Sequence, residues 1–338
     1  MRAAIENWLL GHWYSSAQPP WYLRTLEPLY RFAYQRAQKK DNAAKYQPPV
    51  PLVVVGNLTA GGSGKTPLVI RLCELAAELG LKAGVASTGY GRSGRETVLV
   101  SADSDVAACG DEPVLLARRT GVPVVVARSR IDAVKKLCEI GVDLVISDDG
   151  LQTGSLHRDL EICVVDGERG LGNGHLIPAG PLRESAERLW TVDHVVTNGE
   201  WLTQPGRLAT ELMDLQARVV CALDHQSELS ITDFVTRQAG TPVYAVAAIG
   251  HPGRFFRMLE KLNIAAEKQA FPDHHSFKAA DFSGVEKGAA ILMTEKDAVK
   301  CKRLGLQNAW YIPVVTTLSA EFEHIIKKQL AALMGDNS

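Results

Sequence analysis

The sequence predicts an α/β protein built on a mostly parallel β-sheet that is covered by helices. Between residues 51 and about 200, short apolar runs rich in β-branched residues alternate with stretches of helical pattern. Several runs are apolar almost throughout, which indicates strands buried on both faces, as in a parallel sheet. We expect strands at 51–56, 83–87, 123–127, 143–147, 161–165 and 194–197.

The first 46 residues are richer in aromatic side chains than the rest of the chain, and they also contain several cations. From about Trp21 to Lys40, leucines and tyrosines recur at helical spacing while the basic residues lie mostly elsewhere, which predicts an amphipathic helix. Such a helix suits a bilayer surface, where aromatic rings lie at headgroup depth and cations meet anionic lipid. It equally suits packing on its own domain, and the sequence favours neither interpretation.

A strand that leads through a glycine-rich turn into a helix is the strongest functional signal. The apolar run before Gly56 is followed by a turn that ends in Gly64, Lys65 and Thr66. The helix expected from about 65 to 79 would direct its free N–H groups and positive dipole end at a triphosphate. Lys65 would reach the β- and γ-phosphates, and the Thr66 hydroxyl would ligate Mg²⁺. We therefore predict a P-loop NTPase-like fold whose phosphate contacts come from Thr59, Ala60, Gly61, Gly62, Ser63, Gly64, Lys65 and Thr66.

Acidic residues stand at two further element ends. Asp148 and Asp149 close a buried strand, where a P-loop fold holds its metal, and Mg²⁺ prefers such hard oxygen ligands. Asp111 and Glu112 precede a helical run, so they either cap that helix or activate an attacking hydroxyl. Spacing alone does not separate these two roles.

The densest histidine site lies between Phe271 and Phe277. His274 and His275 are neighbours in a loop, and adjacent residues make a poor metal site because they do not share one helix face. A capping turn in which Asp273 bonds the backbone is the competing interpretation.

A second and smaller α/β set follows a polar stretch with glycine and proline around 198–217. Its strands are expected near 218–223, 242–248, 289–293 and 310–315, with helices near 252–262 and 319–334. The expected organisation is an aromatic and basic helical segment over 1–46, which the bilayer interpretation makes membrane-facing, a P-loop core over 47–205, and a smaller domain over 206–338 that would close over the nucleotide.

Composition excludes several classes of protein. The 37 Lys and Arg residues balance 38 Asp and Glu residues, which leaves no global basic field to gather nucleic acid. The six cysteines form no C-x-x-C pair, as expected of reduced core thiols. No apolar run is long enough to span a bilayer, and no secretory signal is recognisable. We expect a cytoplasmic protein without a nucleic-acid partner, and no feature indicates an obligate protein partner.

Short motifs occur in a specific order along almost the whole chain. They are GGSGKTP at 61–67, GYGR at 89–92, GDEP at 110–113, DDGLQ at 148–152, GNG at 172–174, PAGPLRE at 178–184, GHPGRFF at 250–256, FPDH at 271–274 and TEKD at 294–297. In this order they resemble the tetraacyldisaccharide 4'-kinases, which phosphorylate a lipid A precursor in Gram-negative bacteria.

The resemblance implies that the γ-phosphate of ATP passes to the 4'-hydroxyl of tetraacyldisaccharide 1-phosphate to give the 1,4'-bisphosphate. It implies that Asp111 is the base, that His274 is its partner, and that Lys65 stabilises charge on the transferring group. Mg²⁺ would be held by Thr66, Asp148, Asp149 and Glu184, and the lipid by Tyr90, Arg92, Gln152, Asn173 and Arg183. The protein would lie peripherally on the cytoplasmic leaflet of the inner membrane, with its aromatic N-terminal helix on the lipid.

Two other classes of function fit part of the pattern. A membrane-docked nucleotide switch, a GTPase or partitioning-type ATPase acting through protein partners, would also contain a P-loop. Ala60 stands where the partitioning class has lysine, and Lys296 and Asp297 lack the intervening residue of the guanine-reading motif. A soluble small-molecule kinase would not need the aromatic N-terminus.

Overall fold

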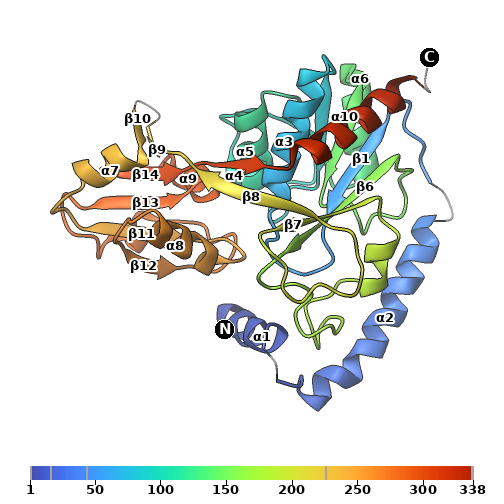
Figure 1. The fold of residues 1–338 in the computed structure, drawn as a ribbon, viewed down its shortest axis with the longest axis horizontal. Coiled ribbons are helices and arrows are strands. Elements are labelled where there is room, and N and C mark those ends of the chain that lie inside the picture. The colour runs from blue at the N-terminus through green and yellow to red at the C-terminus, as the bar shows by residue number, and fades with distance from the viewer. Residues whose placement is uncertain (1, 16, 43–44, 225–226, 336–338) are drawn as a thin grey trace.

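Two β-sheets lie side by side in the computed structural model, which describes residues 2–15, 17–42, 45–224 and 227–335 (Figure 1). The larger sheet has nine strands in the order β15-β8-β7-β6-β1-β5-β2-β4-β3. Its neighbours pair in parallel except at the two edges, where β3 runs antiparallel to β4 and β15 antiparallel to β8. Its strands are β1 (Leu52–Gly56), β2 (Ala83–Ser87), β3 (Val98–Val100), β4 (Val124–Val126), β5 (Leu144–Asp148), β6 (Leu160–Asp166), β7 (His194–Asn198), β8 (Glu211–Ala217) and β15 (Val314–Thr317).

Helices cover both faces of this sheet, as near-continuous apolar strands require. Along β1, Val53 and Val55 face a core formed with α3, α5 and α10, whereas Leu52 and Val54 face a separate core formed with α6. The helices of this domain are α3 (Lys65–Glu78), α4 (Val106–Cys109), α5 (Asp111–Thr120), α6 (Arg130–Ile140), the 3₁₀ helix η1 (Ala186–Trp190) and α10 (Ala320–Gly335).

The smaller domain is built on six strands in the order β10-β9-β14-β13-β11-β12. Its strands are β9 (Val219–Ala222), β10 (Glu228–Ser230), β11 (Val243–Ala247), β12 (Glu267–Ala270), β13 (Ala290–Thr294) and β14 (Ala309–Ile312). Its helices are α7 (Ile231–Arg237), α8 (Pro252–Lys261), the 3₁₀ helix η2 (Ala279–Phe282) and α9 (Glu295–Cys301). The predicted parallel α/β core with a second, smaller α/β domain is confirmed.

The two sheets do not divide the chain at residues 205/206, where the domain boundary was expected. The polar stretch around 198–217 contains β8, which pairs in parallel with β7 of the larger sheet. The strand expected over 310–315 is split at Pro313 into β14 and β15, and β15 returns to pair with β8. The smaller sheet therefore occupies only residues 219–312, inserted between two adjacent strands of the larger one.

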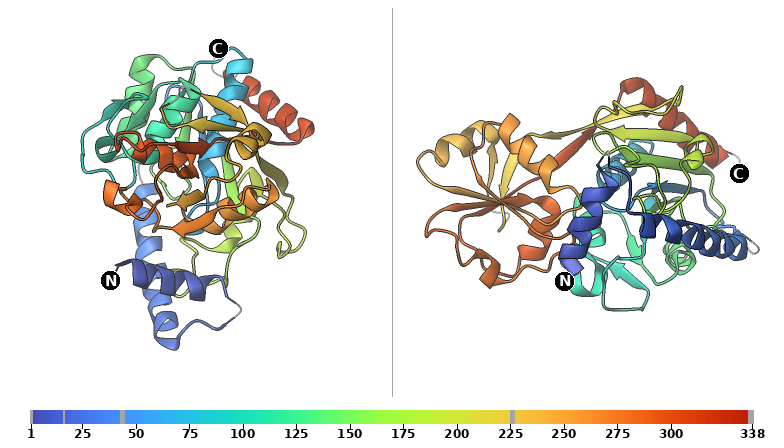
Figure 2. Two further views of the ribbon diagram at one scale, coloured as in Figure 1. Left: turned by 90° about the vertical axis from the view of Figure 1, so that its left-hand side faces the viewer. Right: turned by 90° about the horizontal axis from the view of Figure 1, so that it is seen from below.

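Two N-terminal helices, α1 (Arg2–Trp13) and α2 (Trp21–Asn42), lie along one side of the molecule (Figures 1 and 2). On α2, Leu23 is buried and Tyr30 donates a hydrogen bond to the carbonyl oxygen of Arg183 at 2.9 Å, so one face packs on the core domain. The opposite face, which we call the outer face, exposes Trp21, Tyr22, Leu26, Leu29 and Phe32. Over the described ranges, no helix combines the length and apolar character needed to cross a bilayer. Packing on the domain thus holds for one face, and docking on lipid stays a prediction for the other.

Candidate active site

The glycine-rich turn lies between the carboxyl end of β1 and Lys65, the first residue of α3. Gly64 has φ 97, and a Cβ there would lie 2.3 Å from the Asn198 amide nitrogen, so this position requires glycine. Among the described side chains none caps α3, which leaves the first N–H groups of the helix directed at the turn. The turn itself is braced by neighbours, since the Ala60 N–H donates to the Pro181 carbonyl oxygen at 2.8 Å. The geometry is that of an anion site at a helix N-terminus.

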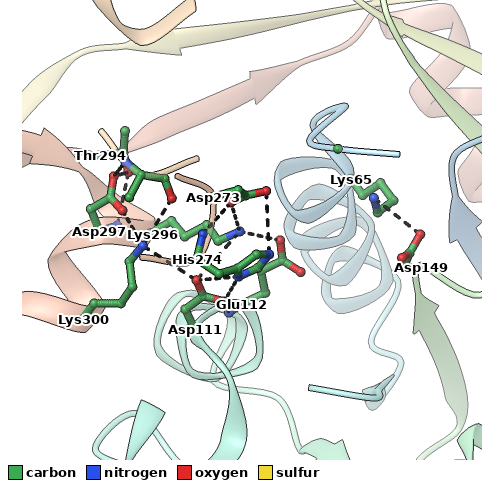
Figure 3. Close-up of polar contacts among 12 residues, drawn as sticks. Lys65, Asp111, Glu112, Asp149, Asp273, His274, Thr294, Lys296, Asp297 and Lys300 are labelled. Atoms are coloured by element: carbon green, nitrogen blue, oxygen red, sulfur yellow. Dashed lines mark hydrogen bonds and ion pairs between the residues drawn. The ribbon is translucent and has the colours of Figure 1, made fainter. Parts of the chain in front are cut away.

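Lys65 bridges the turn to the end of β5. Its Nζ lies 3.1 Å from Asn57 Oδ1 and 3.4 Å from Asp149 Oδ1 (Figure 3). Asp149 also accepts from Arg183 Nη1 at 2.9 Å. Burial would raise the pKa of Asp149, but the charges of Lys65 and Arg183 outweigh it and hold that pKa well below its usual range.

Asp148 has the environment of a cation ligand. It is buried at the end of β5, and its Oδ1 has no hydrogen-bond partner among the described residues. Burial and the nearby charge of Glu112 raise its pKa to about 7. A buried carboxylate oxygen without a donor is costly unless a cation meets it, so Asp148 beside the turn fits Mg²⁺.

The predicted pair of Asp111 and His274 is formed, although the two residues are 163 positions apart and belong to different domains. Asp111 begins α5 and is 4% exposed, and His274 Nδ1 lies 3.0 Å and 3.1 Å from its two carboxylate oxygens (Figure 3). Gly110 occupies the N-cap position of α5, and Asp111 Oδ1 accepts from the Glu112 N–H at 2.9 Å, so Asp111 contacts the first turn of its own helix as well as His274. His274 has φ 58, a left-handed backbone that places its ring over the core domain.

The contact between Asp111 and His274 shifts the pKa of both residues. Burial would raise the pKa of Asp111, but the hydrogen bond with His274 and the charge of Lys296 hold it well below its usual range. Burial would lower the pKa of His274, but the hydrogen bond with Asp111 raises it above its usual value. Asp111 is therefore an ionised base whose partner is biased toward the imidazolium form.

Two lysines of α9 that sequence reasoning did not select surround this pair. Lys296 Nζ lies 2.9 Å from Glu112 Oε1, 3.5 Å from Asp273 Oδ1 and 3.8 Å from Asp111 Oδ2. Lys300 Nζ lies 3.9 Å from the same oxygen of Asp111. The TEKD motif contains Lys296 but not Lys300, and only tertiary structure brings α9 against α5.

The residues predicted to bind the lipid fall into two groups. Tyr90 lies beside the Asp111–His274 pair, since its ring centroid is 5.1 Å from that of His274, and Arg92 follows two residues later in the same loop. Both Nη atoms of Arg92 are buried, and within the described part of the chain neither has a hydrogen-bond partner. An arginine fork in that state is suited to a phosphate group.

Gln152, Arg183 and Glu184 form the second group, on the other side of the turn. Gln152 Nε2 donates to Glu184 Oε1 at 2.7 Å and to the Asn57 carbonyl oxygen at 3.0 Å. Arg183 Nη1 donates to Gln152 Oε1 at 3.2 Å. Glu184 already accepts hydrogen bonds on both carboxylate oxygens, the second from Tyr34 at 3.1 Å, and its role as a metal ligand stays a prediction.

Asn173 has a structural task in this arrangement. Its Nδ2 donates to the Ala179 carbonyl oxygen at 2.9 Å, and its Oδ1 accepts from the His175 N–H at 3.1 Å. These bonds close the loop that carries Arg183 and Glu184 toward the turn. A direct contact of Asn173 with substrate stays a prediction.

The fold and the site together define a P-loop kinase, an ATP-dependent phosphotransferase. Residues 19–331 match the family model described as Tetraacyldisaccharide-1-P 4'-kinase, LpxK, and the chain belongs to this family. It is 44% identical to the tetraacyldisaccharide 4'-kinase of Alcanivorax borkumensis over 93% of this chain and 94% of that protein. It is 41% identical to the enzyme of Azotobacter vinelandii over 99% of this chain and all of that protein.

A solved structure agrees with these relatives. The crystal structure of LpxK from Aquifex aeolicus in complex with ATP is 27% identical, superimposes with a TM-score of 0.74, and covers 92% of this chain and 98% of that one. The predicted P-loop fold, the kinase class and ATP as cosubstrate are thereby confirmed.

Proposed function

We propose that this protein transfers the γ-phosphoryl group of ATP to the 4'-hydroxyl of tetraacyldisaccharide 1-phosphate, a step in lipid A synthesis. The observation that carries the proposal is the pair of buried Asp111 and half-buried His274, assembled from two domains beside a glycine-rich phosphate turn. A nucleotide switch has no need of a carboxylate base with an imidazole partner, whereas transfer to a hydroxyl does.

In this proposal Asp111 accepts the proton of the 4'-hydroxyl as that oxygen attacks the γ-phosphorus in line with the leaving group. His274 orients the carboxylate and favours its ionised form. Lys65 reaches from α3 to neutralise charge that spreads over the transferring group. Because the transition state is loose, positioning and charge neutralisation supply most of the acceleration, and the base adds roughly 10²–10⁴-fold.

Mg²⁺ would be held by Thr66, Asp148 and Asp149, with Glu184 completing the set. When bound, the ion neutralises the phosphate oxygens and orients the nucleotide. The unpartnered and buried Asp148 Oδ1 supports this assignment.

The lipid would be recognised at its polar head and at its acyl chains separately. The two buried Nη atoms of Arg92, which have no partner among the residues described, support a contact with the existing 1-phosphate. A groove beside α2 combines apolar side chains with two arginines and a glutamate, so it suits the boundary between acyl chains and polar headgroups; its lining includes Trp21, Arg24, Glu27, Pro28, Arg31 and Phe32. We propose that the outer face of α2 rests on the cytoplasmic leaflet of the inner membrane, where exposed aromatic side chains gain free energy.

The test is to incubate the purified protein with γ-labelled ATP, Mg²⁺ and tetraacyldisaccharide 1-phosphate in detergent. We expect label in the lipid for the wild type, and almost none for Asp111→Asn, which should still bind ATP. Release of labelled inorganic phosphate without labelled lipid would contradict the proposal and favour a nucleotide switch.

A further inference from the structure

The inner edge of α2 is hydrogen-bonded to the side chains that surround the phosphate turn. Tyr34 donates its hydroxyl to Glu184 Oε2 at 3.1 Å. Gln38, one turn further along α2, donates to the Tyr34 hydroxyl oxygen at 2.9 Å and to the Gln152 carbonyl oxygen at 2.8 Å. Sequence analysis did not select these two as site residues, and Tyr34 belonged there to the N-terminal aromatics and to the leucines and tyrosines that recur at helical spacing.

The network continues from Glu184 to the phosphate turn. Gln152 Nε2 joins Glu184 Oε1 to the Asn57 carbonyl oxygen, and Asn57 Oδ1 accepts from Lys65 Nζ at 3.1 Å. Apart from the step within Asn57, from its backbone carbonyl to its side chain, every step is a direct hydrogen bond, so α2 and the start of α3 are connected through Glu184, Gln152 and Asn57. The Glu184 carboxylate is thereby held between Tyr34 on one side and Gln152 on the other.

If the Tyr34 hydroxyl were removed, the Glu184 carboxylate would have another side chain, that of Arg188, to pair with. Arg188 Nε lies 3.9 Å from Glu184 Oε2, too far for a hydrogen bond in the present arrangement. Glu184 is buried, so an oxygen that loses its donor is expected to turn toward that cation and away from the turn.

The exposed outer face of α2 can be compared with the inner edge of the same helix, which carries Tyr34 and Gln38. Phe32 is 63% exposed and Leu29 is 66% exposed, yet Phe32 lies only two residues before Tyr34. One short stretch of helix therefore presents lipid-compatible side chains on one face and hydrogen-bond donors to the site on the other.

We propose that Tyr34 and Gln38 are positioning residues of the nucleotide and metal site, which makes α2 a wall of the active site as well as a docking element. The inference rests on the proposed function, because it assumes that Glu184 serves Mg²⁺. Loss of a partner that orients a metal ligand typically costs about 10–100-fold in metal affinity. Tyr34→Phe keeps the ring and removes only the donor, so the cost should fall on Mg²⁺ and not on folding.

The experiment measures binding of a fluorescent ATP analogue as a function of Mg²⁺ concentration, with sedimentation on anionic liposomes as a second readout. For Tyr34→Phe and Gln38→Leu we expect the half-saturating Mg²⁺ concentration to rise at least about tenfold, with liposome binding unchanged. Phe32→Ser is the matched control, for which we expect weaker liposome binding and an unchanged Mg²⁺ requirement. Thermal unfolding followed by circular dichroism verifies that each variant is folded.

Glu184→Gln separates this inference from the proposed function. If Glu184→Gln raises the Mg²⁺ requirement but Tyr34→Phe and Gln38→Leu do not, α2 positions nothing and the inference is overturned. If none of the three variants changes it, the metal role of Glu184 fails and the inference fails with it, while labelled lipid still reports the kinase activity separately. A loss of liposome binding by Tyr34→Phe equal to that of Phe32→Ser would make α2 a docking element only.

Discussion

Lys296→Met should move the acid limb of the kcat profile to higher pH. Asp111 acts as a base only when ionised, and cations close to its carboxylate lower its pKa in the folded enzyme. Removing one of those cations raises that pKa, so activity is lost at a less acidic pH than in the wild type.

The magnitude follows from the distance. Lys296 Nζ lies 3.8 Å from Asp111 Oδ2, and at an effective dielectric constant of about 20 the interaction of two charges near that distance is ~4 kcal/mol, or about three pKa units. Lys300 stays 3.9 Å from the same oxygen, and His274 stays hydrogen-bonded to it. With this compensation we expect the acid limb to move by about one to two pH units.

The assay is kcat against pH at saturating ATP, lipid and Mg²⁺, so that a bound cation keeps Asp148 ionised and its titration near pH 7 does not mask that of Asp111. Circular dichroism at each pH shows that the fold persists. Arg119→Met is the matched control, because Arg119 pairs with Glu295 at 2.6 Å between the same two helices, α5 and α9. It removes an interdomain ion pair without removing a cation from Asp111, so its acid limb should coincide with that of the wild type. A folded Lys296→Met enzyme with an unshifted acid limb would refute the electrostatic argument.

Three further outcomes are expected. Lys65→Ala should lower kcat at least about 100-fold with the fold preserved, and a variant that keeps more than a tenth of wild-type kcat would exclude the phosphate role. Asp111→Asn and His274→Ala should each lower kcat much more than they change the KM for ATP, and the double variant should lose far less than the product of the two, whereas fully multiplicative losses would mean independent roles. Phe322→Ala should lower the free energy of unfolding in urea by about 3–5 kcal/mol, because Phe322 is 1% exposed in the core under α10, while the exposed Glu321→Ala should change it little.

The parts of the fold that could be predicted are those with local signals. The apolar run of β1 and the turn before Lys65 combine a burial pattern with a phosphate motif, so both strand and site were recognisable. By contrast β12, with sequence Glu-Lys-Gln-Ala, has four exposed residues and forms only because β11 offers it a parallel edge. β8 lies in a stretch whose polarity and glycines suggested a linker, and its pairing with β7 decides its conformation.

The residues of the site likewise fall into those with a signal in the sequence and those whose role depends on tertiary contacts. Asp111 and His274 were available from motif order, but spacing along the chain could not distinguish a base from a helix cap. That decision depends on contact between two domains, as does the position of Lys296. Tyr34 had no signal at all beyond its helical spacing, because its partner Glu184 lies 150 residues away.

The return of the chain from the smaller domain to the larger one has a consequence for biosynthesis. β15 completes the edge of the nine-stranded sheet next to β8, and α10 packs on α3 through the core that contains Leu68 and Phe322 and through the ion pair of Arg71 with Glu323 at 2.8 Å. A nascent chain that has emerged only as far as β14 therefore lacks an edge strand and exposes apolar surface on α3, and such sequence-distant contacts form slowly. The phosphate turn, made within the first fifth of this sequence, becomes part of a finished domain only when β15 and α10 have left the ribosome. Stop codons that remove β15 and α10, neither of which contains a predicted site residue, should be as damaging as the loss of Lys65 itself.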